Sequence, residues 1–250
     1  MLSIFSFAPK VKEDFSLLGT DMHSHLLPAV DDSGESTNHC LRMIRSLEDM
    51  GFHTLYTTPH SIQSIHPNTL ESLAESYNTI KDSLPENLRF DYSSEYFLDE
   101  LFLNNLDNKQ LRPLPDNRLL IEFSMVSMPY KLETQFFDIL MQGYQIVLAH
   151  PERYLFFQKD QGILARLKDM DIEFQVNALS LGGYYGDNVK HLADKLIDNG
   201  WVDFIGTDAH HDKHIRALRK IPATRSYKRL LDQGILKNNT LLALSEYQKQ

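Results

Sequence analysis

The sequence predicts an α/β fold in which seven short strands alternate with helices and close into a seven-stranded (β/α) TIM-like barrel. Three observations support this prediction. Short apolar and β-branched segments recur along the chain, amphipathic segments that end in glycine lie between them, and no glycine-rich nucleotide-binding turn is present. Strand–helix–strand units favour parallel pairing, and seven of them without such a turn favour a barrel over an open sheet.

Seven segments have the length and composition of strands and are bounded by polar or structure-breaking residues. In chain order they are Leu18–Met22, Thr54–Thr57, Leu88–Ser93, Arg118–Glu122, Gln145–Leu148, Ile172–Val176 and Val202–Ile205. Parallel strands of a barrel end at one face, so the residues that follow these segments are expected to meet there.

Two helices are predicted from apolar residues at helical spacing, each followed by a glycine suited to a helix C-terminus. Their residues are Cys40, Met43, Ile44 and Leu47 before Gly51, and Val189, Leu192, Ala193, Leu196 and Ile197 before Gly200. A weaker pattern over Thr134–Met141 ends at Gly143, and Pro67-Asn68 most simply starts a helix.

We expect one domain over residues 1–250, with residues 1–17 as an N-terminal extension and residues 228–250 as an extra C-terminal helix packed on the outside. The 42% hydrophobic content allows a substantial core, and the net charge of −9 argues against a general nucleic-acid binder. The single cysteine fits a reducing cytoplasm. Neither a signal peptide nor a membrane-spanning apolar run is predicted.

Residue types that bind divalent metals stand at or just after the ends of six predicted strands. His23 and His25 are two residues apart in an extended segment, so both side chains point to one side and can chelate one ion. Taken alone, such a pair could equally be surface or core histidines. Asp208 and His210 follow the seventh strand with the same spacing.

Carboxylates end two of the strand regions. Glu122 closes the apolar run Leu119-Leu120-Ile121, and Glu95 ends the third strand region. Burying a carboxylate is costly unless it is paired or metal-bound, which favours a functional role for Glu122. His150 closes the fifth strand in the same way.

The remaining candidates lie in loops, where ordinary roles are common. Asp31 and Asp32 follow the first strand and could serve in a turn or as a helix N-cap. His60 lies just beyond the second strand, and a lone loop histidine is usually a surface group. The sixth strand ends at Gln175-Val176-Asn177, which offers hydrogen-bonding side chains or no function.

Together these positions predict a metal centre. The nine candidate ligands are His23, His25, Asp32, His60, Glu95, Glu122, His150, Asp208 and His210. They exceed what one ion uses, so two or three divalent ions with a bridging carboxylate are expected. Clustered divalent cations suit phosphoryl transfer, because they neutralise phosphate oxygens and generate hydroxide near neutral pH.

Two arginines are candidate catalytic residues. Arg153 follows His150 by three residues and could bind a phosphate oxygen, the alternative being a surface salt bridge with Glu152. Arg216 lies beyond His210 and is the second candidate.

A cysteine-dependent phosphatase is excluded by spacing. That mechanism needs an arginine six residues after the cysteine, where Ser46 stands after Cys40. Cys40 also lies on the apolar face of a predicted helix, so we expect it in the core. The glycine-rich fingerprints of nucleotide-binding proteins are likewise absent from the sequence.

These motifs resemble the polymerase and histidinol phosphatase (PHP) superfamily of metal-dependent phosphoesterases. The resemblance is closer to its bacterial protein-tyrosine-phosphatase branch, which acts on the tyrosine autokinases of capsule and exopolysaccharide synthesis. The matching stretches span residues 21 to 210 and are Asp21–His25 with Val30–Asp32, Thr58–His60, Ser94-Glu95, Leu120–Ser124, Ala149–Tyr154 and Thr207–His210.

The resemblance implies a distorted seven-stranded barrel of the PHP fold with three metal ions. It places His23, His25, Glu95 and Asp208 on one ion, Glu95, Glu122 and His150 on a second, and Asp32, His60 and His210 on the third. Arg153 matches the family's catalytic arginine. Ser33 stands before Gly34, where the family usually has glycine directly after the aspartates. The ligand is therefore Asp31 or Asp32, with Asp32 favoured.

The function expected from these features is a cytoplasmic, metal-dependent protein-tyrosine phosphatase. Its partner would be a phosphotyrosine-bearing protein, namely a bacterial tyrosine autokinase, and it would attack phosphorus with metal-activated hydroxide. Manganese is the expected metal, with iron, zinc and magnesium as alternatives. The rival functions are a phosphoesterase of the same fold acting on histidinol phosphate or another small metabolite, and a non-catalytic metal-binding regulatory module.

Overall fold

The computed structural model describes residues 14–34 and 36–241. Within them nine strands pair in parallel to form two sheets, with strand orders β1-β2-β4 and β3-β5-β6-β7-β8-β9. The strands are β1 (Thr20–Asp21), β2 (Thr54–Thr57), β3 (His60–Ser61), β4 (Arg89–Tyr92), β5 (Glu95–Phe97), β6 (Arg118–Glu122), β7 (Gln145–Ala149), β8 (Glu173–Asn177) and β9 (Phe204–Gly206). The α/β class and the parallel pairing predicted from the sequence are confirmed.

All seven predicted strands are present, but the sheet is divided. The predicted second and third strands each break and resume in the other sheet, β2 continuing into β3 after Thr58-Pro59 and β4 into β5 after Ser93-Ser94. Proline has no N–H for a sheet ladder, which explains the first break. The resumed strands β3 and β5 are short and begin with charged or polar residues, so no apolar pattern in the sequence predicts them.

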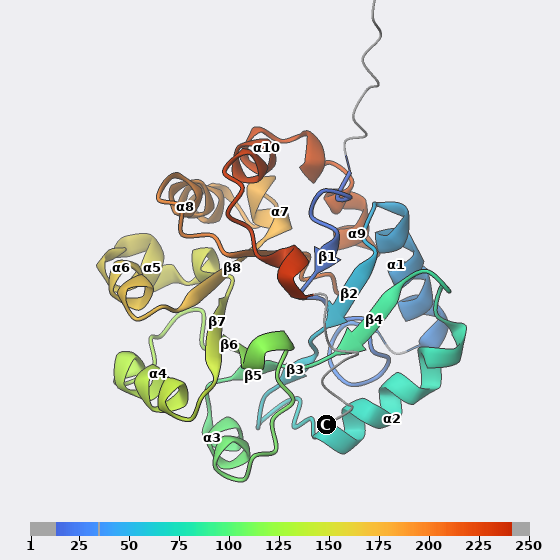
Figure 1. Cartoon of the computed structure of the whole chain (residues 1–250), viewed down its shortest axis with the longest axis horizontal. Helices are drawn as coiled ribbons and strands as arrows, with labels where there is room; N and C mark the ends of the chain where they lie inside the picture. Colours follow the sequence, from blue (N-terminus) through green and yellow to red (C-terminus); the bar gives the residue numbers. More distant parts are fainter. Residues whose placement is uncertain (1–13, 35, 242–250) are drawn as a thin grey trace, which may run out of the picture.

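Helices surround the strands on the outside (Figure 1). They are α1 (Thr37–Asp49), α2 (Leu70–Ile80), α3 (Glu100–Asp107), α4 (Leu132–Met141), α5 (Leu155–Lys159), α6 (Gly162–Asp169), α7 (Ala178–Leu181), α8 (Asp187–Asp198), α9 (Asp212–Leu218) and α10 (Arg225–Asp232). Short 3₁₀ turns are η1 (Lys81–Ser83), η2 (Pro115–Asn117), η3 (Pro151–Arg153), η4 (Ile221–Ala223) and η5 (Asn238–Leu241). None of the helices in residues 14–34 and 36–241 has the length and hydropathy needed to cross a bilayer.

The helices predicted from apolar spacing are confirmed as α1, α8 and the weaker α4. Glycines follow all three with positive φ, +103° at Gly51, +87° at Gly143 and +67° at Gly200, as helix C-termini require. Cys40 is a buried free cysteine on the core face of α1, as expected. Helix α2 begins at Leu70, because the Thr69 side chain caps it, rather than at Pro67-Asn68.

The C-terminal segment differs from the predicted outer helix. Helix α10 ends at Asp232, and η5 follows after a non-helical stretch. Leu241 is fully buried in an inner apolar cluster enclosed by the strands, and its carbonyl accepts a 2.6 Å hydrogen bond from the Tyr56 hydroxyl. Figure 1 shows this red turn near the centre of the ring of elements. Residues 1–13 of the predicted extension and residues 242–250 lie outside the described residues.

The carboxamide of Asn238 joins β1 of one sheet to β9 of the other. Its Nδ2 donates to the carbonyls of Thr20 at 2.9 Å and Ile205 at 2.7 Å, and its Oδ1 accepts from the Ile205 N–H at 3.0 Å. Backbone groups at a sheet edge need partners when they are buried, and Asn238 is only 1% exposed. One side chain therefore satisfies three backbone groups at the seam between the sheets.

We predict that Asn238→Ala lowers the free energy of unfolding by about 3 kcal/mol, because buried backbone groups of both sheets lose their partners. Urea denaturation in the presence of a chelator measures this change without a contribution from metal binding. Asn239→Ala is the matched control, since Asn239 is exposed, and it should change the stability by less than about 0.5 kcal/mol. Equal effects of the two substitutions would contradict the role of Asn238.

Candidate metal centre

Eight of the nine candidate ligands meet at the carboxyl ends of the strands. They form four overlapping groups whose ligand atoms lie within 4.8 Å of one another. The groups are His23, His25 and Glu95; His23, His150 and Asp208; His60, Glu95 and Glu122; and His25, His60 and His210. The sequence therefore predicted the gathering of these residues, which come from segments after β1, β7 and β9 and from β3, β5 and β6.

The carboxylate of Glu95 lies at the centre of the cluster and is fully buried. Its Oε2 is 3.1 to 3.4 Å from nitrogen atoms of His23, His25 and His60. Its Oε1 is 2.8 Å from Nε2 of His150. Two atoms that each lie about 2.1 Å from one ion are themselves about 3.0 to 3.4 Å apart, so these separations fit shared coordination.

Several of these atoms lack hydrogen-bond partners. In the described part of the chain, Nδ1 of His60, Oε2 of Glu95 and Oε1 of Glu122 are buried without one. His60 Nδ1 nevertheless lies 3.1 Å from Glu95 Oε2 and 2.8 Å from Glu122 Oε1. Buried polar atoms are normally hydrogen-bonded. Lone pairs that converge without suitable hydrogen-bond geometry are what a divalent cation requires, so the residues fit a metal.

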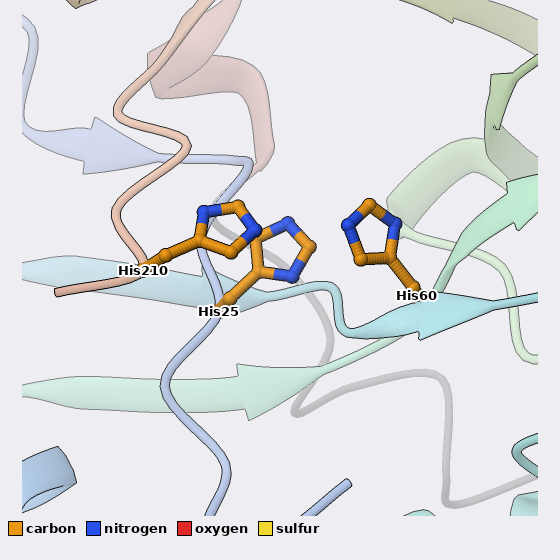
Figure 2. A group of neighbouring side chains, drawn as sticks. All are labelled: His25, His60 and His210. Atoms are coloured by element: carbon orange, nitrogen blue, oxygen red, sulfur yellow. The ribbon is translucent and has the colours of Figure 1, made fainter. Parts of the chain in front are cut away.

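A second part of the cluster consists of three imidazoles, those of His25, His60 and His210 (Figure 2). The His25 and His210 rings stack at a centroid distance of 3.8 Å, and His60 faces them with its centroid 4.5 Å from that of His25. Figure 2 shows the rings of His25 and His210 entering from two loops and that of His60 from the start of β3. Rings packed this closely cannot all be protonated without strong repulsion, which favours neutral imidazoles facing a cation.

Fixed acceptors orient three of the imidazoles. Nδ1 of His25 is 2.7 Å from Oδ2 of Asp31, and Nδ1 of His210 is 2.9 Å from the Asp208 carbonyl. Nδ1 of His23 is 2.8 Å from Oε1 of Gln175. Because these oxygens only accept, the neutral form of each imidazole carries its proton on Nδ1 and keeps a lone pair on Nε2 for a metal.

The two aspartates of the first loop have different surroundings. Besides binding His25, Asp31 accepts hydrogen bonds from the N–H and hydroxyl of Ser33, at 3.1 and 2.6 Å. Asp32 is exposed, lines the cavity beside the cluster, and has Oδ1 3.6 Å from Nε2 of His210. Asp31 is thus occupied in orienting His25, while Asp32 is free to face the cavity.

Two amide side chains of β8 connect ligands that come from different strands. The His150 N–H donates to Oε1 of Gln175 at 3.2 Å, which fixes the orientation of that amide. Nε2 of Gln175 then donates to Oδ1 of Asn177 at 2.9 Å, and Nδ2 of Asn177 donates to Oδ2 of Asp208 at 2.6 Å. The possibility of supporting hydrogen bonds from the sixth strand is therefore confirmed.

The sequence did not predict the roles of two buried carboxyl groups near the centre. Asp21 accepts from the N–H and hydroxyl of Thr207 at 2.9 and 2.6 Å, joining β1 to the segment after β9, and burial raises its pKa to about 7. Glu152 accepts from the Asn177 N–H at 2.9 Å and the Ser180 hydroxyl at 2.7 Å, and burial raises its pKa. No periodic pattern marks either, because their partners are distant in sequence.

Two ligand positions have unusual backbone conformations. The φ angles of His150 and Asp208 are +34° and +50°, in the left-handed region that residues other than glycine rarely adopt. His150 directly follows β7, and Asp208 lies two residues after the end of β9. The sharp turn there directs each side chain back into the cluster, and strain of this kind is typical of functional sites.

Arg153 lies beside the cluster, and Arg216 does not. Nη1 of Arg153 donates to Oδ2 of Asp208 at 2.9 Å, and its guanidinium lies 4.7 Å from the centre of the Tyr185 ring. The alternative of a surface salt bridge with Glu152 is wrong, since Glu152 is fully buried. Arg216 is exposed on α9, whose neighbouring His214 and Ile215 face inward, and is not among the described residues around the cavity.

A cavity of about 410 Å³ opens beside these groups. Its lining combines candidate metal ligands and Arg153 with the apolar residues Ile62, Phe97, Phe123 and Met125. The first group can interact with a phosphate and the second with an aromatic ring. The chemistry of the lining therefore suits an aryl phosphate.

The histidines and carboxylates of the cluster shift one another's pKa values. Burial lowers the pKa of His25, but the Asp31 carboxylate outweighs it and raises that pKa to about 9. Burial raises the pKa of Asp208, but the His23 imidazole and other nearby cations bring it well below its usual range. Without a cation, protons on the imidazoles must balance the carboxylates, so a binding metal has to displace protons.

Comparison with known proteins identifies relatives of this arrangement. A family model described as "Capsular polysaccharide synthesis, CpsB/CapC" matches residues 19–237. Tyrosine-protein phosphatase YwqE of Bacillus subtilis is 29% identical over 77% of this chain and 78% of its own. Tyrosine-protein phosphatase CpsB of Streptococcus pneumoniae is 26% identical over 76% of this chain and 82% of its own.

Solved structures show the same fold. A chain from the crystal structures of YwqE and CpsB, described as "unique metal-dependent tyrosine phosphatases", is 26% identical with a TM-score of 0.73, over 88% of this chain and 94% of that chain. An amidohydrolase from Mycoplasma synoviae is 12% identical with a TM-score of 0.54, over 90% and 85% of the two chains, which shows similarity of fold alone.

We predict that Gln175→Leu weakens binding of a divalent metal by about 10- to 100-fold, because His23 loses the acceptor that sets its tautomer. Titration of the metal-free protein against a chromophoric chelator measures this affinity independently of activity. Gln145→Leu is the matched control. Gln145 lies at the start of β7, and its side chain donates a hydrogen bond to the Asp171 carbonyl and not to a residue of the cluster. Unchanged metal affinity in Gln175→Leu would contradict the positioning role.

Proposed function

The chain belongs to the CpsB/CapC family of capsular polysaccharide synthesis, and on this premise we propose that it is a metal-dependent protein-tyrosine phosphatase. The named relatives are tyrosine phosphatases, and a structurally similar pair is described as metal-dependent. The observation that carries the proposal is a cavity whose lining combines residues of the converging ligand groups with apolar and aromatic side chains.

We infer that two or three divalent ions bind the cluster, with manganese the expected metal. Glu95 would bridge two of them, since its two oxygens face different sets of imidazoles. Asp32, His60 and His210 would hold the third, supported by their common position at the cavity. When bound, the ions supply Lewis acidity and a water that is acidic enough to act as a nucleophile near neutral pH.

The protein's own residues would orient the substrate and bind its phosphoryl group. Arg153 offers guanidinium N–H groups at the edge of the cavity for phosphoryl oxygens, while Asp208 holds its Nη1 in place. Phe97, Phe123 and Met125 would contact the phenyl ring of phosphotyrosine. The Cys40 thiol does not take part, because burial raises its pKa to about 11 and it lies on the core face of α1.

We further infer that the two sheets belong to one distorted seven-stranded (β/α) barrel forming a single domain. The chain passes directly from β2 to β3 and from β4 to β5, and Asn238 joins the seam between β1 and β9. We also propose a bacterial tyrosine autokinase as the physiological substrate and a cytoplasmic location, in keeping with the single unpaired cysteine.

We predict that the protein hydrolyses phosphotyrosine peptides only when divalent metal is supplied. Exhaustive chelation should abolish turnover, and manganese should restore it, whereas alkylation of Cys40 with iodoacetamide should leave turnover unchanged. The same assay with histidinol phosphate tests the small-metabolite alternative, and we expect much slower hydrolysis there. Activity that survives complete metal removal would refute the proposed mechanism.

We predict that Arg153→Ala lowers kcat/KM for a phosphotyrosine peptide by about 10²- to 10³-fold, because a positioned donor to the phosphoryl group is lost. Arg216→Ala is the matched control and should stay within about twofold of the wild type, since Arg216 is exposed away from the cavity. Metal content measured for each variant separates a loss of donor from a loss of metal. Similar losses in both variants would contradict the assignment.

A further inference from the structure

A second hollow of about 380 Å³ adjoins the proposed catalytic cavity. The two share Met125, Arg153 and Tyr185, so the second lies directly beside the first. Its far side is formed by Leu155 at the start of α5 and by the first turn of α8. The Leu155 N–H donates to the Met125 carbonyl at 2.9 Å, which holds the two walls together.

The hollow is mainly apolar and carries no excess positive charge. Met125, Leu155 and Val189 supply aliphatic surface, and Tyr185 supplies an aromatic ring. Its cation, Arg153, is already paired with Asp208, and Asp187 adds a negative charge at the rim. The hollow therefore offers an acidic segment no unpaired cation, whereas it can accommodate an uncharged apolar side chain.

Exposed apolar side chains gather on the segments around both hollows. Val126, Met128 and Tyr130 follow β6, Leu155 follows β7, and Tyr184 follows β8, with exposed fractions between 43% and 80%. Large apolar side chains exposed together usually mark a binding surface. This surface lies at the carboxyl ends of the strands, on the same side as the metal-ligand cluster.

We propose that the second hollow binds the polypeptide next to the phosphotyrosine of the substrate protein, with an apolar side chain of that segment against Leu155 and Val189. This proposal rests on the proposed function. A phosphotyrosine in the cavity is attached to a chain that must leave over the rim, and the second hollow begins at the rim residues Arg153 and Tyr185. The hollow therefore selects among phosphotyrosine sites by the residue beside them.

The test compares free O-phosphotyrosine with phosphotyrosine peptides that carry leucine or glutamate on either side of the phosphorylated residue. We expect the wild type to prefer a leucine-flanked peptide by about tenfold in kcat/KM, the factor that burial of one aliphatic side chain supplies. Leu155→Glu should remove this preference, mainly through KM, and should leave hydrolysis of free phosphotyrosine unchanged. Leu155→Ala should give a smaller loss in the same direction.

The matched control is Leu17→Glu. Leu17 is 64% exposed and precedes β1, at the opposite ends of the strands from the hollow, so its substitution should change no kinetic parameter. Thermal unfolding of each variant verifies that the fold is intact. Leu155 is itself 47% exposed, and glutamate suits the first turn of a helix, so Leu155→Glu is expected to fold.

Binding of a peptide with a non-hydrolysable difluorophosphonate in place of the phosphate separates docking from turnover. Selective binding that depends on Leu155, without turnover of any phosphotyrosine substrate, would refute the proposed function and retain the docking site. Turnover without a preference for apolar flanks would refute the docking site and retain the phosphatase. A dimer that Leu155→Glu converts to monomer in sedimentation would also refute it, because a second copy would then cover the hollow.

Discussion

The arrangement of the strand ends depends on the burial of one carboxylate, that of Glu95, among imidazoles from the segment after β1, from β3 and from the segment after β7. A buried anion is tolerated only where positive charge compensates it. Here the surrounding nitrogens lie at separations that suit shared ligands, and several buried atoms have no hydrogen-bond partner. A divalent cation meets both requirements at once, which explains why His23, His25 and His60 converge where they would otherwise repel one another.

Hydrogen bonds from outside the cluster hold these ligands in place. Asp31 and Gln175 fix the tautomers of His25 and His23, and Asn177 and Arg153 bind the carboxylate of Asp208. Most of these groups are buried, so few alternative partners are available to them. The division of the sheet serves the same end, because the breaks after β2 and β4 bring His60 of β3 and Glu95 of β5 to the cluster.

Charge and apolar surface are separated on the carboxyl face of the strands. The buried histidines and carboxylates gather in the cluster, while the loops after β6, β7 and β8 expose aliphatic and aromatic side chains. Net charge alone argued only against nucleic acid as a partner. The positions of the charged side chains in the structure are more informative about the partner than the net charge. The cation Arg153 and the aromatic ring of Tyr185 line both hollows.

The sequence by itself determined the α/β class, the seven main strand positions, the helices α1 and α8, and the eight candidate ligands that gather at the strand ends. These features follow from local patterns of hydrophobic residues and from ligand types placed at strand ends, which parallel strands necessarily bring together. Only the tertiary structure decided the division of the sheet, the different roles of Asp31 and Asp32, the Gln175–Asn177 connection and the position of Arg216. These depend on hydrogen bonds and packing between segments distant in the chain, which leave no periodic trace in the sequence.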